Sequence, residues 1–144
     1  MTLRALLDIN VLIALLDAGH QNHDDARTWL LRNVGSGWAS CPLTQNGCVR
    51  ILSQPGYPNA VPTSVALEKL ATACASPQHE FWTDAVSLID PKTVHGHRIH
   101  GPRQLTDLYL LALAVHNGGR FVTFDRSIAL GAVRRAATKH LVVI

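Results

Sequence analysis

Four short segments of almost continuous apolar residues constrain the fold of this chain more than any other feature of its sequence. They cover residues 3–7, 38–41, 121–124 and 141–144. None of them alternates between apolar and polar residues, so each is typical of a strand that is buried on both faces. Strands of that kind belong to parallel sheets covered by helices. The sequence therefore predicts a central, mainly parallel sheet.

Helical patterns separate these predicted strands. Apolar residues recur at helical spacing in residues 26–34 and 67–74, and residues 106–116 are apolar almost all round. A chain in which strands and helices alternate is predicted to form a three-layer α/β/α sandwich. The Pro-rich stretch 54–62 is expected to be a loop between helices.

The segment between His79 and Gly101 has the least regular pattern. We expect a short strand at residues 86–88, followed by an irregular loop that is rich in histidine. No repeat, low-complexity tract or long linker divides the 144 residues, so residues 1–144 are expected to form a single domain.

Composition narrows the cellular setting. The chain has three cysteines without a CxxC pair, so neither a disulfide framework nor a zinc knuckle is expected. The apolar N-terminus is interrupted by Asp8, Asn10 and Asp17, and no apolar run approaches the roughly 18 residues that span a membrane. We expect a cytoplasmic protein without a membrane partner. Its ten arginines and three lysines give only a weak indication of a phosphorylated or nucleic-acid partner.

Three aspartates occupy positions that suit chemistry. Asp8 directly follows the first predicted strand, and Asp125 directly follows the strand at residues 121–124. Ligands bind at this edge of open α/β sheets. Asp107 opens the most apolar helix and lies on the side expected to be buried. Helix capping could explain each acid alone. Three converging carboxylates, however, would repel one another without a hard cation, so the set predicts a Mg²⁺ or Mn²⁺ site.

Three further polar residues are expected to support this cluster. Gln45 lies on the apolar stripe of the helix that follows residues 38–41, so its side chain is expected to face the acids. Asn10 could hold the loop after Asp8, orient a water molecule or cap the next helix. Thr123 points to the same sheet face as Asp125 by strand alternation, and its hydroxyl could brace the cluster, although β-propensity explains it equally well.

Four segments together resemble the PIN-domain ribonucleases, and specifically the VapC-type toxins of bacterial toxin–antitoxin pairs. They are LLDINVLIALLD, CPLTQNGCVRIL, LTDLYLLALAVHNGG and RFVTFD, in this order. The resemblance covers nearly the whole chain. It implies a PIN-like α/β/α sandwich that hydrolyses single-stranded or structured RNA, such as tRNA, rRNA or mRNA, with Mg²⁺ or Mn²⁺.

Matched by position, the acids of the family correspond to Asp8, Asp107 and Asp125, which would be both catalytic and metal-binding. The family's second acid is usually Glu, and this chain has Gln45 there. An amide oxygen can coordinate a cation but adds no charge and cannot act as a base, which puts a second metal in doubt. The resemblance also implies a homodimer and a cognate antitoxin.

The implied reaction is attack by water on phosphorus, which leaves a 5′-phosphate and a 3′-hydroxyl. Arginines near the predicted site are candidates for contacts to the RNA backbone, and as single residues they could equally be solvated surface charges. These candidates are Arg50, Arg98, Arg103 and Arg126.

Three other interpretations fit parts of the sequence. His95, His97 and His100 could supply imidazoles to Zn²⁺, but no Cys or carboxylate at ligand spacing completes the set. A haloacid-dehalogenase-type phosphatase also places an Asp after its first strand, but it needs a second acid where this chain has Asn10. Gln45 favours a catalytically degraded RNA- or partner-binding module, although such a module would gain nothing from keeping three clustered acids.

Overall fold

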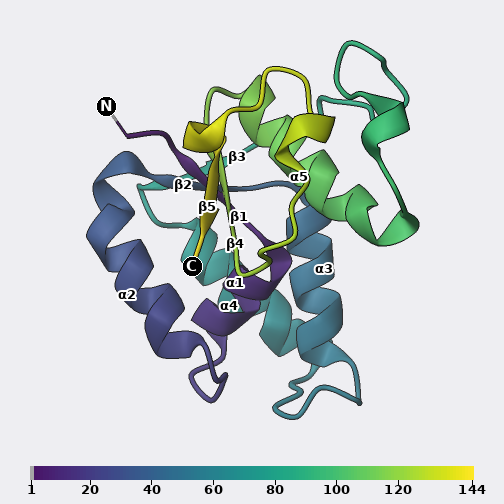
Figure 1. The fold of residues 1–144 in the computed structure, drawn as a ribbon. Coiled ribbons are helices and arrows are strands. Elements are labelled where there is room, and N and C mark those ends of the chain that lie inside the picture. The colour runs from purple at the N-terminus through teal and green to yellow at the C-terminus, as the bar shows by residue number, and fades with distance from the viewer. Residues whose placement is uncertain (1) are drawn as a thin grey trace.

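The computed structural model describes residues 2–144, which form a five-stranded sheet covered by helices on both faces (Figure 1). All strand pairs are parallel, and the strand order is β3-β2-β1-β4-β5. The strands are β1 (Ala5–Leu7), β2 (Trp38–Ser40), β3 (His79–Phe81), β4 (Arg120–Thr123) and β5 (Leu141–Val143). The helices are α1 (Ile9–Leu16), α2 (His23–Asn33), α3 (Pro42–Ser53), α4 (Thr63–Cys74) and α5 (Leu105–His116).

The two faces of the sheet bury different helices. Leu6 and Phe121 belong to one apolar cluster, together with the inner side of α5. Their strand neighbours Leu7 and Val122 belong to a second cluster, together with α1, α2, α3 and α4. Because successive strand residues point to opposite faces, strands with apolar residues on both faces were needed to fill both clusters. The predicted three-layer α/β/α sandwich is confirmed.

Four of the five strands are those predicted, three of them with shorter bounds and β4 shifted by one residue toward the N-terminus, and β3 was missed. The expected strand at residues 86–88 is wrong. Val86 and Leu88 pack against the α5 cluster as part of an irregular segment between β3 and α5. The predicted helices within 26–34, 67–74 and 106–116 are present, and residues 54–62 form the loop between α3 and α4.

A tight turn places α5 over the centre of the sheet. Gly118 has a φ of 65°, a conformation that favours glycine. The amide nitrogen of Gly119 then donates to the carbonyl oxygen of Ala114 at 2.8 Å. A Cβ atom on Gly119 would lie only 2.7 Å from the carbonyl oxygen of Arg4, so the chain can enter β4 beside β1 only with glycine there.

The strand order contains one switch point, where successive strands are added to opposite sides of β1. From β1 the chain adds β2 and β3 on one side, and then β4 and β5 on the other. The carboxyl ends of β1 and β4 meet there, with Leu7 opposite Val122. Ligands of open α/β sheets bind at such switch points. Across residues 2–144, no helix is both long and apolar enough to cross a bilayer.

Candidate active site

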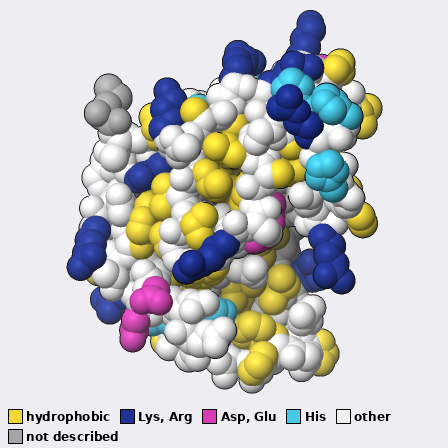
Figure 2. All heavy atoms as spheres, viewed as in Figure 1, with side chains coloured by type: hydrophobic (Ala, Val, Ile, Leu, Met, Phe, Trp, Pro, Cys, Tyr) yellow, Lys and Arg dark blue, Asp and Glu magenta, His cyan; other side chains and the backbone are white. Residues whose placement is uncertain are grey.

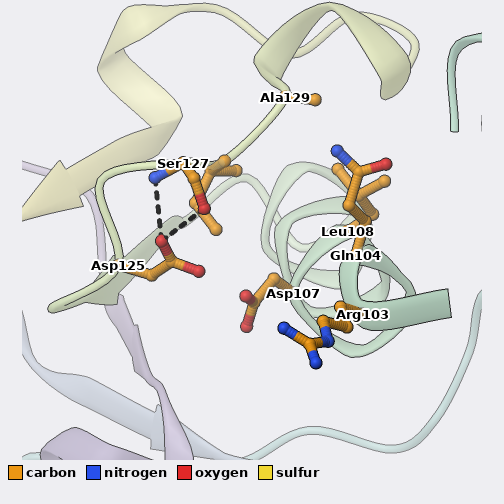
Figure 3. Close-up of a pocket in the computed structure, with 8 residues that line it drawn as sticks. Arg103, Gln104, Asp107, Leu108, Asp125, Ser127 and Ala129 are labelled. Carbon is orange, nitrogen blue, oxygen red and sulfur yellow. Dashed lines mark hydrogen bonds between the residues drawn. The ribbon is translucent and has the colours of Figure 1, made fainter. Parts of the chain in front are cut away.

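Three aspartates, Asp8, Asp107 and Asp125, lie at the point where β1 and β4 meet, and we call them the acid cluster. Asp8 follows β1, Asp125 follows β4, and Asp107 lies in the first turn of α5. Asp107 and Asp125 line a cavity of about 200 Å³. Figure 3 shows their carboxylates turned toward each other across it. The structure thus brings together the acids that the sequence predicted to converge.

Asp8 is the most enclosed member of the acid cluster, with 6% of its surface exposed. One carboxylate oxygen accepts the backbone N–H of Ile9 at 2.7 Å and caps α1. The other accepts the hydroxyl of Thr123, also at 2.7 Å. Burial raises the pKa of Asp8 in spite of these two hydrogen bonds, and the charge of Asp125 raises it further. Asp8 therefore both caps α1 and belongs to the acid cluster.

Thr123 connects two of the acids. It is fully buried in β4, and its Oγ1 accepts the backbone N–H of Asp125 at 3.0 Å while its hydroxyl donates to Asp8. One hydroxyl therefore fixes both the side chain of Asp8 and the backbone of Asp125. The bracing position that strand alternation predicted for Thr123 is confirmed.

Asp125 and Asp107 have opposite electrostatic environments. The hydroxyl and the backbone N–H of Ser127 donate to Asp125 Oδ1 at 2.6 and 2.8 Å, and these bonds lower the pKa of Asp125. Burial, then the charge of Asp8 and the proximity of Asp125, raise the pKa of Asp107 to about 7. At neutral pH the carboxyl of Asp107 is therefore about half protonated, whereas Asp125 is ionised.

The ionised form of Asp107 is disfavoured first by burial and then by the negative charges of Asp8 and Asp125. A divalent cation would relieve this repulsion, and carboxylate oxygens are the ligands that Mg²⁺ and Mn²⁺ prefer. The chemistry of the donor set therefore fits such an ion. Across residues 2–144, no three His, Cys, Asp or Glu side chains are grouped so that they could hold an ion as they stand. The binding of an ion would therefore have to be accompanied by deprotonation of Asp107 and a rearrangement of the acids.

Gln45 does not line the acid cavity, contrary to our expectation. Its Nε2 donates to the hydroxyl of Ser40 at 3.0 Å, and it borders a separate cavity of about 450 Å³ between α3 and α4. The physical reason is that α3 packs on the sheet face opposite α5. Its inward side therefore meets Ser40, whereas Asp107 lies on α5. Asn10 is exposed in the first turn of α1, and Asp8 is the residue that caps this helix.

The four candidate arginines are dispersed. Arg103 lines the acid cavity, close to Asp107 (Figure 3). Arg50 borders the cavity between α3 and α4. Arg98 donates from Nη1 to the carbonyl oxygen of Gly131 at 3.0 Å, and Arg126 is exposed directly after Asp125. Only Arg103 of these four is placed at the acid cavity.

Sequence analysis missed two polar residues that line the acid cavity. Ser127 follows Asp125 by two positions, and this Asp-x-Ser spacing is the local pattern in which a serine bonds back to an aspartate. Gln104 also lines the cavity, and its Oε1 accepts the backbone N–H of His100 at 2.7 Å. No sequence signal separated Gln104 from an ordinary surface residue.

The chain is similar to known proteins along nearly its whole length. The family model described as "PIN domain" matches residues 5–133. "Ribonuclease VapC44" of Mycobacterium tuberculosis is 52% identical over 142 residues, which cover 99% of this chain and 100% of that protein. "Ribonuclease VapC39" of the same organism is 40% identical over 126 residues, covering 87% and 91%.

A solved structure supports the fold independently. It is described as the crystal structure of VapBC2 from Rickettsia felis bound to a DNA fragment from their promoter. The matching chain has a TM-score of 0.56 and 13% identity, covering 84% of this chain and 87% of that chain. At this identity the match bears on the architecture alone.

Proposed function

Because this chain belongs to the PIN domain family, we propose that it is a metal-dependent endoribonuclease and the toxin of a toxin–antitoxin pair. The observation that carries the proposal is the acid cluster at the switch point of the sheet, where burial and like charge raise the pKa of Asp107 to about 7. The ribonuclease names of its full-length relatives support the same activity.

In this proposal Asp8, Asp107 and Asp125 hold Mg²⁺ or Mn²⁺. When bound, such an ion lowers the pKa of water and offsets charge on the phosphodiester undergoing attack. Asp107 must lose its proton before it can act as a ligand, because a protonated carboxyl is a poor one. Ser127 keeps Asp125 ionised, and Thr123 holds Asp8 in place.

In this proposal, positively charged side chains around these acids bind the RNA. Arg103 borders the acid cavity and is placed to contact a phosphate that approaches it. Arg98 and Arg126 lie in neighbouring loops and remain candidates for backbone contacts farther along the RNA. We propose a cytoplasmic homodimer with a cognate antitoxin as its regulatory partner, and the VapC names of the relatives support the antitoxin part of this proposal.

Incubation of the purified protein with total RNA, with and without Mg²⁺ or Mn²⁺, tests this proposal. We expect metal-dependent cleavage that yields 5′-phosphate and 3′-hydroxyl ends, and none with Asp125→Asn. The matched control is Asp24→Asn, which removes the same charge from the exposed surface of α2. A 2′,3′-cyclic phosphate product, or full activity of a folded Asp125→Asn variant, would refute the proposal.

A second candidate is a PIN-like module that binds RNA or a partner without cleaving it. The observation that favours it is Gln45, which adds no charge to the site and bonds to Ser40 instead. Calorimetric titration of Mg²⁺ and Mn²⁺ separates the two candidates. The module is supported if neither ion binds at millimolar concentration and no RNA is cut.

A further inference from the structure

The positive charge of the chain is concentrated after residue 90. Residues 91–144 contain eight of the thirteen Lys and Arg residues and five of the eight histidines. They contain only two of the ten acids, Asp107 and Asp125, both of which belong to the acid cluster. The formal charge is thus +6 for residues 91–144 and −3 for residues 1–90. Such asymmetry between parts of a chain is typical of proteins that bind nucleic acid.

Two loops of this segment are held together by backbone hydrogen bonds. Val94 and Val133 form an isolated antiparallel bridge. On either side of it, the N–H of His95 donates to Ala132 O at 2.8 Å and the N–H of Arg134 donates to Thr93 O at 3.0 Å. The basic side chains of the two loops are therefore presented from a fixed backbone, which reduces the entropy lost when a ligand binds.

Four of these basic side chains gather at one place, near the C-terminal end of α5. Lys92, His116, Arg134 and Arg135 all border a small hollow of about 50 Å³, and we call them the basic ledge. No acid lines this hollow. Arg135 has a φ of 64°, the sole non-glycine residue with positive φ in residues 2–144. Left-handed backbone at a residue with a long side chain is strained and marks positions with a function.

The charges of the basic ledge have no acidic partner. Within the described part of the chain, the one ion pair shorter than 4 Å joins Arg4 to Glu80 in another region. The surface next to the ledge is also positive. Desolvation and then the charges of Arg134, Arg98 and His97 lower the pKa of His95. Figure 2 shows Lys, Arg and His side chains gathered over the upper part of the face on which α5 lies.

We infer that the basic ledge binds the phosphate backbone of the RNA several nucleotides away from the acid cluster. This inference rests on the proposed function, because it assumes that RNA enters at Asp107. The hollow is far too small for a base, so the contact is with phosphate oxygens and carries no sequence information.

The length of α5 sets the spacing between the two sites. Asp107 lies in the first turn of α5 and His116 is its last residue, nine positions later. At a rise of 1.5 Å per residue the two are about 14 Å apart along the helix. A stacked strand advances about 3.4 Å per nucleotide. The middle of α5 is buried, so the strand must pass around it, and the ledge is at least about four nucleotides from the acid cluster.

Binding of oligoadenylates of 4 and 12 nucleotides tests this inference without relying on cleavage. We expect the double variant Lys92→Gln/Arg135→Gln to weaken binding of the 12-mer and to leave binding of the 4-mer unchanged. Each lost phosphate contact lowers the slope of log affinity against log salt by about 0.7. When the salt concentration rises from 50 to 200 mM, the factor by which affinity falls should therefore be about sevenfold smaller for the double variant than for the wild type.

The control variant is Arg27→Gln/Arg32→Gln, which removes two exposed positive charges from α2 and should keep the wild-type slope. The single variant Arg135→Lys keeps Lys92 and the positive charge at position 135, so it should have the wild-type slope. An unchanged slope and affinity in the ledge variant, or an equal loss in the α2 control, overturns the inference.

Two further results are informative. Polyglutamate that binds more tightly than the 12-mer, and loses this binding in the ledge variant, would assign the ledge to an acidic protein instead of RNA. If the 12-mer binds as expected but no RNA is cleaved with any metal, the proposed nuclease activity fails while the phosphate-binding ledge stands.

Discussion

Replacement of Asp107 by Asn should make the protein more stable at alkaline pH while it abolishes RNA cleavage. In the folded protein the pKa of Asp107 is raised from 3.8 to about 7. Below about pH 4 the carboxyl is protonated in both the folded and the unfolded state, so it has no effect on stability. Between about pH 4 and pH 7 the carboxyl is ionised in the unfolded state but still protonated in the folded state, so stability falls as the pH rises, and the loss is complete above about pH 7.

The size of this effect follows from the pKa. A shift from 3.8 to about 7 corresponds to at most about 4 kcal/mol, at 1.36 kcal/mol per unit. Asp107 is only half-buried, and water screens much of this penalty. We therefore expect Asp107→Asn to raise the free energy of unfolding by about 1 to 2 kcal/mol at pH 8, and by almost nothing at pH 4.

Thermal unfolding at pH 4 and pH 8 measures the difference. For a chain of 144 residues, a gain of 1 to 2 kcal/mol corresponds to an increase in Tm of roughly 3 to 7 °C at pH 8. Glu68→Gln, which removes an exposed carboxylate from α4, is the matched control and should leave the pH dependence unchanged. The reasoning is refuted if Asp107→Asn is as stable as the wild type at pH 8, or less stable.

Three further predictions concern the neighbours of the acid cluster. Ser127→Ala removes the hydroxyl donor to Asp125 and keeps the backbone donor, so the pKa of Asp125 should rise, which NMR titration of its carboxyl carbon measures; an unchanged pKa contradicts this role. Thr123→Val should lower the free energy of unfolding in urea by about 1 to 3 kcal/mol, because it leaves buried groups of Asp8 and Asp125 without a partner. Thr123→Ser keeps the hydroxyl and should have most of the wild-type stability. Gln45→Ala should reduce the rate of cleavage by less than about tenfold, or 1.4 kcal/mol, because the side-chain amide of Gln45 bonds to Ser40. A loss of activity as complete as that of Asp125→Asn would place Gln45 in the site.

The sequence predicted the four strands whose apolar side chains pack on both faces of the sheet, including the half-exposed edge strand β5, and missed β3. β1, β2, β4 and β5 were predicted because their side chains must fill two apolar clusters. β3 has the sequence HEF and lies at the edge of the sheet, where Glu80 and Phe81 are exposed. An edge strand of three residues needs no apolar pattern, so periodicity could not reveal it.

The acid cluster was predictable because strand ends converge at one edge of a parallel sheet, and Asp8 and Asp125 each follow a strand. The position of Gln45 was not predictable in the same way. A helical stripe shows which side of a helix faces inward, but it does not show which face of the sheet the helix covers. α3 covers the face opposite α5, so Gln45 contacts Ser40.

The central claim is that the acid cluster cuts RNA, and the mapping of RNA ends in cells after induced expression tests it most directly. The wild type should create new 5′-phosphate ends at defined sites, and Asp8→Asn should create none. Asn keeps the ability of residue 8 to cap α1, so this variant should remain folded, which circular dichroism verifies. The same new ends in cells that express a folded Asp8→Asn variant would contradict the account.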